Sequence, residues 1–148
     1  MRCGAGCASC CTVELTVLAI EADPIGGYVR GLGDAARTAL AARAEARPDA
    51  LSPRCAALDD DHRCAIYPVR PLVCRSHGVP IRTGDLVDAC SLNFHKRTPS
   101  TVPPADVLVQ DTMSTVLLAL DAARAAAVDV PAGTRVALRA LLAGAAGG

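Results

Sequence analysis

Aromatic side chains are almost missing from this chain of 148 residues, which has no Trp, one Phe and two Tyr. Aromatic residues supply large areas of buried surface in most protein cores. A core made chiefly of Ala, Leu and Val buries less surface per side chain, so a metal staple would help such a fold, although this length does not require one. The length itself predicts a single domain.

The sequence also lacks an excess of charge and a long apolar run. Fifteen basic residues balance fifteen acidic ones, so we expect no general attraction to nucleic acid or to an anionic membrane. No run approaches the roughly 18 to 20 apolar residues of a membrane span. The first eleven residues contain no apolar signal segment. These features predict a cytoplasmic protein and leave any protein partner unknown.

Cysteine is what the chain has in abundance. Thiols stay reduced in the cytoplasm, so eight of them favour a metal site over a disulfide framework. Two four-thiolate zinc sites, or one iron–sulfur cluster with spare thiols, are both compatible with this number. Some of the cysteines could instead be small buried side chains. The candidates are Cys3, Cys7, Cys10, Cys11, Cys55, Cys64, Cys74 and Cys90.

The prediction of a metal site centres on residues 63–78, RCAIYPVRPLVCRSHG. Pro68 and Pro71 fix φ and remove backbone donors, so we expect a rigid extended connector without helix. Cys64 and Cys74 lie near its ends, where a rigid connector would hold two ligands at a fixed separation. His77 follows Cys74 at Cys-x-x-His spacing and is either a further metal ligand or a surface histidine.

Four cysteines have an arginine next to them in the sequence. Guanidinium groups near a thiolate site would offset its negative charge and lower thiol pKa values. Arg70 and Arg75 are the candidates for this supporting role, since both lie in the connector. The alternative is base composition, because all basic residues but Lys96 are Arg. The early acids, Glu14 and Glu21 among them, are candidate oxygen ligands or solvated acids that begin a helix.

The segments 54–58 and 63–67 flank an acidic turn, DDDH, and predict a short β-hairpin. With a four-residue loop, Leu58 would face Arg63 and Ala57 would face Cys64. Side chains alternate along a strand, so Cys55 and Cys64 would then lie on the same face. A diagonal pair of this kind is suited to sharing a metal ion.

Helical patterns occupy much of the remaining chain. Residues 12–16 could form a strand or a first helical turn, and a helical pattern begins near Leu18 with an interruption at Pro24. Asp34 is the predicted N-cap of a helix through about Ala46. The longest helix is predicted over 105–128, and Thr134 is the predicted cap of the last one. The predicted buried residues are Leu18, Ile20, Ile25, Val29 and Leu32 early in the chain, and Val109, Met113, Val116, Leu117, Leu120 and Ala123 in the long helix.

These elements together predict a mainly α, small, cysteine-rich and metal-stabilised domain with a short β-hairpin and a C-terminal helical segment. We expect a cysteine-cluster region over 1–96, a linker over 97–104 and a helical segment over 105–148 that packs on the first region. One compact unit is the expected result.

The order and spacing of four motifs resemble the YkgJ-type cysteine-cluster family, also called the CxxCxxCC or zinc- or iron-chelating domain. These motifs are CxxCC at 7–11, PRCAAL at 53–58, CAIYPVRPLVCR at 64–75 and DAC at 88–90. The resemblance implies metal chelation through these cysteines, with zinc and iron both proposed. It covers roughly residues 3 to 94. Cys3 departs from the family spacing, because three residues separate it from Cys7 where the family usually has two.

Three functions are therefore open at this point. The first is a metal-binding protein whose thiolates hold zinc or iron, or an iron–sulfur cluster. The second is a cluster-dependent enzyme with a protein-modifying or redox activity, because a flagellin lysine methylase has a similar cysteine motif. The third is a helical interaction scaffold in which metal is only a staple. No catalytic motif can be placed in the sequence, so an enzyme is the weaker expectation.

Overall fold

The structure is a computed structural model that describes residues 6–46, 54–94, 96 and 98–146. Helices outweigh strands, so the predicted mainly α, cysteine-rich fold with a C-terminal helical segment is confirmed. In chain order the elements are β1 (Thr16–Leu18), α1 (Ala19–Arg30), α2 (Asp34–Glu45), the 3₁₀ helix η1 (Tyr67–Val69), α3 (Leu72–Ser76), β2 (Ile81–Thr83), β3 (Leu86–Asp88), α4 (Ser91–Phe94), η2 (Pro99–Thr101), η3 (Pro104–Asp106), β4 (Leu108–Val109), α5 (Gln110–Val128), β5 (Arg135–Ala137) and α6 (Leu138–Ala146).

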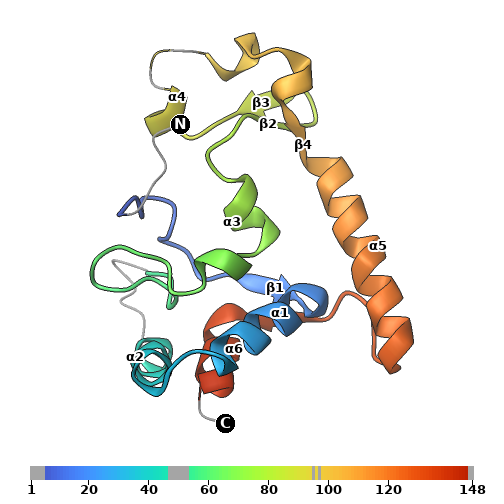
Figure 1. Cartoon of the computed structure of the whole chain (residues 1–148). Helices are drawn as coiled ribbons and strands as arrows, with labels where there is room; N and C mark the ends of the chain where they lie inside the picture. The colour runs from blue at the N-terminus through green and yellow to red at the C-terminus, as the bar shows by residue number, and fades with distance from the viewer. Residues whose placement is uncertain (1–5, 47–53, 95, 97, 147–148) are drawn as a thin grey trace.

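Three helices form a base at one end of the molecule (Figure 1). Helix α6 packs against both α1 and α2, and β1 pairs with β5 in an antiparallel ladder that places Val17 opposite Val136. The early helices are thereby joined to the last one, far away in the sequence. The most deeply buried large apolar residues of this base are Val17, Ile25, Val29, Leu40, Ile66, Leu138 and Leu142.

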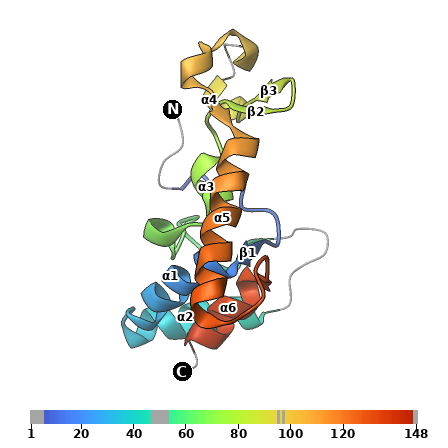
Figure 2. The ribbon, with the colours of Figure 1, turned by 90° about the vertical axis from the view of Figure 1, so that its right-hand side faces the viewer.

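A small three-stranded sheet lies at the other end, and α5 runs along the side of the molecule between the two ends (Figures 1 and 2). In this sheet β2 pairs antiparallel with β3 and parallel with β4. Asp121 of α5 is buried, and its two carboxylate oxygens accept the backbone N–H groups of Ile20 (3.0 Å) and Gly133 (2.8 Å). This carboxylate fixes α5 to the start of α1.

Helix α1 begins at Ala19, close to the predicted start near Leu18, and it continues through Pro24 without the predicted interruption. Its first turn is held by side chains: Glu21 Oε2 accepts the Leu18 N–H (3.2 Å), and Asp121 accepts that of Ile20. Local sequence shows nothing of the Asp121 contact, which satisfies an N–H that the first helical turn leaves without a partner. Of the predicted buried set, Leu18, Ile25 and Val29 are buried, whereas Ile20 and Leu32 are half-buried.

Helix α2 ends close to its predicted end, but Asp34 is not its N-cap. Gly33 occupies the cap position, and Asp34 is the first helical residue. The Asp34 carboxylate instead accepts a hydrogen bond from Arg37 Nη2 at 2.7 Å, one turn further along. An acid in the first turn still interacts favourably with the helix dipole.

The prediction of a helix-free connector is wrong, because residues 63–78 contain η1 and α3. Pro68 lies in the first turn of η1, and Pro71 is the N-cap of α3. At the start of a helix the N–H that proline lacks has no intrahelical partner, so proline is tolerated there. Cys74 consequently lies within a short helix and not at the end of an extended segment.

The predicted hairpin around the acidic turn is reduced to one antiparallel bridge, between Leu58 and Cys64. The predicted register is wrong by one residue, because the loop holds five residues and His62 adopts a left-handed φ of 59°. Asp59 Oδ1 accepts the Arg63 N–H at 2.7 Å and closes this loop. The regular hairpin is the β2–β3 pair, whose turn contains Gly84 at a φ of +58°.

The apolar stripe predicted for the long helix is only in part a buried face. Met113 and Leu117 are half-buried, whereas Val116 and Leu120 are each 54% exposed; the buried residues of α5 are Asp121 and Ala125. Helical spacing predicted the periodicity of the apolar residues, but it did not predict whether another element would cover them. In Figure 2, no other helix of the described residues lies over the side of α5 that faces the viewer. Among the helices that the structure describes, none combines the length and apolarity needed to cross a membrane.

The last helix also begins later than predicted. Thr134 does not cap it: the Thr134 hydroxyl donates to the Pro131 carbonyl (2.8 Å), and β5 intervenes before α6 begins at Leu138. The Leu138 N–H donates to the Leu15 carbonyl at 2.8 Å, which extends the β1–β5 connection into the start of α6. The division into 1–96, 97–104 and 105–148 remains a prediction.

Candidate metal centre

Five thiols from three segments lie within range of one another's charge. Cys10 and Cys11 belong to the N-terminal loop, Cys55 and Cys64 to the two sides of the acidic turn, and Cys74 to α3. Cys10, Cys55 and Cys64 each contribute to raising the pKa of Cys11, and the same three raise that of Cys74. Thiols up to 64 residues apart in the sequence thus lie in one region of the molecule, and their role as metal ligands remains a prediction.

Backbone hydrogen bonds bring the first two segments together. The Cys55 N–H donates to the Cys11 carbonyl at 2.9 Å, and the Cys11 N–H donates to Ala8 O, also at 2.9 Å. The Leu58 N–H then returns to the Cys55 carbonyl (3.0 Å), so Cys55 begins a turn and not a strand. The hydrogen bond from Cys55 to Cys11 thus places these two segments side by side. The predicted strand alternation that would put Cys55 and Cys64 on one face does not apply, because Cys55 lies in a turn.

Cys64 and Cys74 are positioned by the connector between them. The Ala65 N–H donates to the Ala57 carbonyl (2.8 Å), which holds Cys64 beside the Cys55 turn. At the other end, Glu21 Oε1 accepts the Leu72 N–H at 2.8 Å, the first N–H of α3. Glu21 is therefore an acid at the start of two helices, α1 and α3, and both of its oxygens are engaged in that role.

Burial is the main cause of the thiol pKa shifts. It raises the pKa of Cys11 to about 12 and that of Cys74 to about 11, with neighbouring thiolates as the next contribution, and it raises the pKa values of Cys55 and Cys64 as well. These thiols are neutral near pH 7 in the absence of a cation. A bound metal ion would stabilise their ionised form and release protons.

The donor set fits a metal that prefers sulfur. Thiolates are typical ligands of zinc and of iron–sulfur clusters, and five thiols exceed the four that either tetrahedral zinc or a cubane cluster takes. Within the described residues, no three His, Cys, Asp or Glu side chains are already arranged to hold one ion.

The remaining candidate ligands lie differently. Cys7 is half-buried beside Ser9, with 3.8 Å between Sγ and Oγ, and Cys90 is half-buried just before α4. Neither is among the main contributors to the thiol pKa shifts. His77 is exposed at the C-cap of α3. The prediction for Cys3 falls outside the described residues, and the ligand role of all four remains a prediction.

Arg70 and Arg75 both lie within the connector, but their side chains make different contacts. Arg70 Nε donates to the Tyr67 carbonyl (3.2 Å), and its guanidinium lies 3.6 Å from the centre of the Tyr67 ring. The Arg70 charge lowers the pKa values of Cys64 and Cys74, against the larger effect of burial. Arg75 Nε donates to the Arg70 carbonyl (2.8 Å) and Nη2 to that of Pro68. Arg75 thus bridges two carbonyls, and Arg70 supplies charge.

Two arginines beside cysteines in the sequence are not among the main charges that shift the pKa values of Cys55 and Cys64. Arg54 Nη2 donates to the Asp59 carbonyl, and its side chain approaches Asp60 at 3.7 Å, so it supports the acidic turn. Arg63 is exposed at the end of that turn. Adjacency in the sequence therefore did not predict which arginine acts on which thiol.

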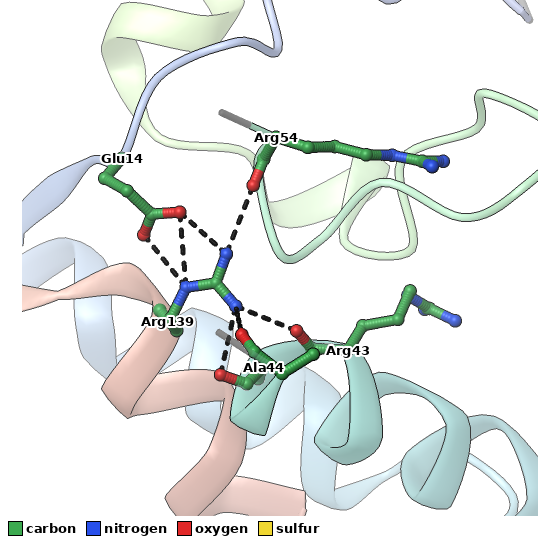
Figure 3. A network of polar contacts seen from close by, with 6 residues as sticks. Glu14, Arg43, Ala44, Arg54 and Arg139 are labelled. Atoms are coloured by element: carbon green, nitrogen blue, oxygen red, sulfur yellow. Dashed lines mark hydrogen bonds and ion pairs between the residues drawn. The ribbon is translucent and has the colours of Figure 1, made fainter. Parts of the chain in front are cut away.

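One arginine that the sequence analysis missed lies close to the thiol segments. Arg139 of α6 pairs with Glu14 (2.7 Å) and donates to the backbone carbonyl of Arg54, the residue before Cys55 (Figure 3). Burial raises the pKa of Cys55; the negative charge of Glu14 adds to this rise, and the positive charge of Arg139 opposes it to a smaller extent. Glu14 is accordingly the partner of an arginine and not a free oxygen donor. In the sequence, the only sign of this role is that Arg139 is the single charged residue of the apolar helix α6.

The comparison with protein families agrees with this site. Residues 2–91 match the CxxCxxCC family, described as a "putative zinc- or iron-chelating domain", and the match spans more than half of the chain. The chain belongs to this family, a class of cysteine-rich metal-binding domains. No curated protein and no solved structure matches it. The matched residues contain every cysteine of the sequence, whereas α5 and α6 lie beyond them.

Proposed function

We propose that the protein binds zinc or iron through thiolates of the group formed by Cys10, Cys11, Cys55, Cys64 and Cys74, with an iron–sulfur cluster as one form of the bound iron. What supports this most is that backbone hydrogen bonds hold the Cys55 segment beside Cys11 (2.9 Å) and the Cys64 segment beside Ala57 (2.8 Å), so that thiols from separate parts of the chain lie near one another. Family membership supports the same conclusion. The cytoplasm, where thiols stay reduced, is the proposed compartment.

Anaerobic purification with elemental analysis tests the metal and its identity. A brown protein that absorbs in the thiolate-to-iron charge-transfer region would contain iron–sulfur, whereas a colourless protein with one equivalent of zinc would be a zinc protein. Metal content below a tenth of an equivalent, after reconstitution with either metal under reducing conditions, would contradict the proposal.

Single Cys→Ser variants then test which thiols bind the metal. We expect Cys64→Ser and Cys74→Ser to lose more metal than Cys3→Ser or Cys90→Ser, because the first two thiols belong to the group whose charges interact. Serine is close to isosteric with cysteine but is a far poorer ligand for a soft cation. Equal metal loss in all four variants would show that the site extends beyond the five thiols.

One observation favours a second function, an interaction scaffold built on α5. The helix exposes Val116 and Leu120, one turn apart on the same side, by 54% each, and no charged side chain interrupts it between Asp111 and Asp121. Exposed apolar surface of this kind often marks an interaction site. Sedimentation velocity of the wild type and of Leu120→Glu tests self-association through this side of α5, and identical monomeric profiles at high concentration would contradict it.

A further inference from the structure

The Arg139 guanidinium uses all of its donor directions. Nε and Nη2 donate to the Glu14 carboxylate, at 3.1 and 2.7 Å. Nη1 donates to three carbonyls at the end of α2, those of Arg43 (2.8 Å), Ala44 (3.1 Å) and Ala46 (2.9 Å). Nη2 also donates to the Arg54 carbonyl at 3.2 Å (Figure 3). One side chain therefore joins α6 to three other parts of the chain.

Two of these parts carry metal-site thiols. Glu14 follows Cys11 by three residues, and Arg54 immediately precedes Cys55. The Cys55 N–H in turn donates to the Cys11 carbonyl at 2.9 Å. Arg139, Glu14, the Cys11 carbonyl and the Arg54–Cys55 backbone thus form a closed ring of contacts. The third part, the end of α2, belongs to the packed base and anchors this ring to it.

We propose that Arg139 is a positioning residue for the thiol site, which it supports from α6, outside the family segment. It holds the segments of Cys11 and Cys55 beside each other, so that both thiols are kept on the same part of the molecule for metal binding. This inference rests on the proposed function. It also explains why α6, which contributes no ligand, carries an arginine that donates to the carbonyl of Arg54, the residue before Cys55.

The planar fork of arginine is what this position requires. A lysine keeps the charge but presents its donors from one point, so it cannot serve the Glu14 carboxylate, the end of α2 and the Arg54 carbonyl together. Glu14→Gln keeps the shape of the partner and removes its charge. Both changes loosen the link without deleting the base, which is held by the apolar core.

Cobalt(II) is the probe, because its thiolate charge-transfer bands report how many sulfurs bind it. We compare the wild type, Arg139→Lys, Arg139→Gln and Glu14→Gln in the whole reduced chain, by anaerobic titration and by competition with a chelator. Mutation of a residue that positions metal ligands typically lowers the metal affinity by about 10- to 100-fold. We expect a loss of this size in both Arg139 variants, a smaller loss in Glu14→Gln, and weaker charge-transfer bands in all three.

Arg124→Gln is the matched control. The Arg124 side chain is 22% exposed against 19% for Arg139, and it pairs with Asp23 across a similar sequence separation, but it joins α5 to α1 and touches no thiol segment. We expect Arg124→Gln to lower the melting temperature while its cobalt spectrum and affinity stay as in the wild type. A general loss of stability is thereby separated from the loss of positioning.

A metal-free measurement distinguishes this inference from the proposed function. In the reduced apoprotein, we expect Arg139→Gln to increase the iodoacetamide alkylation rate of Cys55, measured by mass spectrometry, at least threefold more than that of Cys90. Wild-type protein that binds no cobalt would overturn the proposed function, and the alkylation rates would then decide the role of Arg139. Wild-type affinity and spectrum in Arg139→Gln, with unchanged alkylation of Cys55, would overturn this inference alone.

Discussion

The base and the thiol region are held together by different forces. Val17, Ile25, Leu40 and Leu142 are fully buried in the base, where helices and a strand ladder satisfy the backbone. The loop before β1 and the segment 54–71 contain little regular structure and are held by single backbone and side-chain hydrogen bonds. Apolar burial stabilises the base without any cofactor, whereas the thiol region gathers neutral sulfurs whose ionisation would require a cation.

Metal removal is the most direct way to break this comparison. Where the metal-binding residues are not organised before the metal binds, the free energy of metal binding stabilises the fold. Structural zinc contributes about 10–16 kcal/mol in this way in small zinc-dependent domains. We expect chelation to remove hydrogen-exchange protection from residues 6–15 and 54–78 while α1, α2 and α6 keep theirs. Equal loss of protection in both regions would show that the base also depends on metal.

A cavity in the base should produce the complementary result. Leu142 is fully buried among α1, α2 and α6, so Leu142→Ala should reduce the free energy of unfolding by about 2–5 kcal/mol. Leu118→Ala, on the exposed side of α5, should change it by less than about 0.5 kcal/mol. Denaturant unfolding of the metal-free proteins measures both. Similar values for the two variants would mean that the core does not lie where the structure places it.

The pH dependence of the metal-free protein tests the thiol region alone. Burial raises the pKa of Cys74 to about 11 from 9.0, so the folded protein holds this proton over a pH range in which the unfolded chain has lost it. The associated stability is fully present below about pH 9 and is lost as pH rises toward 11. Over this interval Cys74→Ser should lose less stability than the wild type. Parallel curves of stability against pH for the wild type and Cys74→Ser, from pH 8 to 11, would contradict the raised pKa of Cys74.

The sequence predicted the chemistry of the site better than its geometry. Cysteine number and spacing predicted the cysteine-rich metal-binding family to which the chain belongs, because motif order reflects ligand chemistry. Helices α1 and α2 followed from apolar periodicity and composition. Partners supplied from far along the chain were not predictable: Asp121 at the start of α1, Glu21 at the start of α3 and Arg139 beside Cys55.

Local backbone geometry explains the other errors. The left-handed His62 adds one residue to the acidic loop and shifts the register that alternation had suggested. The two prolines of the connector begin helices, which the rule that proline ends them does not anticipate. The α5 stripe has the period of a core helix, but burial depends on a covering layer, and periodicity contains no information about that layer.

The smallest expected effect separates the two connector arginines. Arg75 donates to the carbonyls of Pro68 and Arg70, a geometry that lysine cannot reproduce, so Arg75→Lys should lower the melting temperature of the metal-free protein by a few degrees. Arg70 donates to one carbonyl and lies over the Tyr67 ring, and its charge acts on Cys64 and Cys74.

Arg70→Lys keeps that charge and the cation–π contact, so its melting temperature should fall less than that of Arg75→Lys and its metal content should stay near wild type. Arg70→Gln removes the charge and should weaken metal binding while shifting the melting temperature of the metal-free protein little. Arg82→Lys, at an exposed position of β2, is the control for a neutral exchange. If Arg75→Lys behaves like Arg82→Lys, the bridge between the two carbonyls does not hold the connector, and Glu21 at the start of α3 is then the side chain that fixes it.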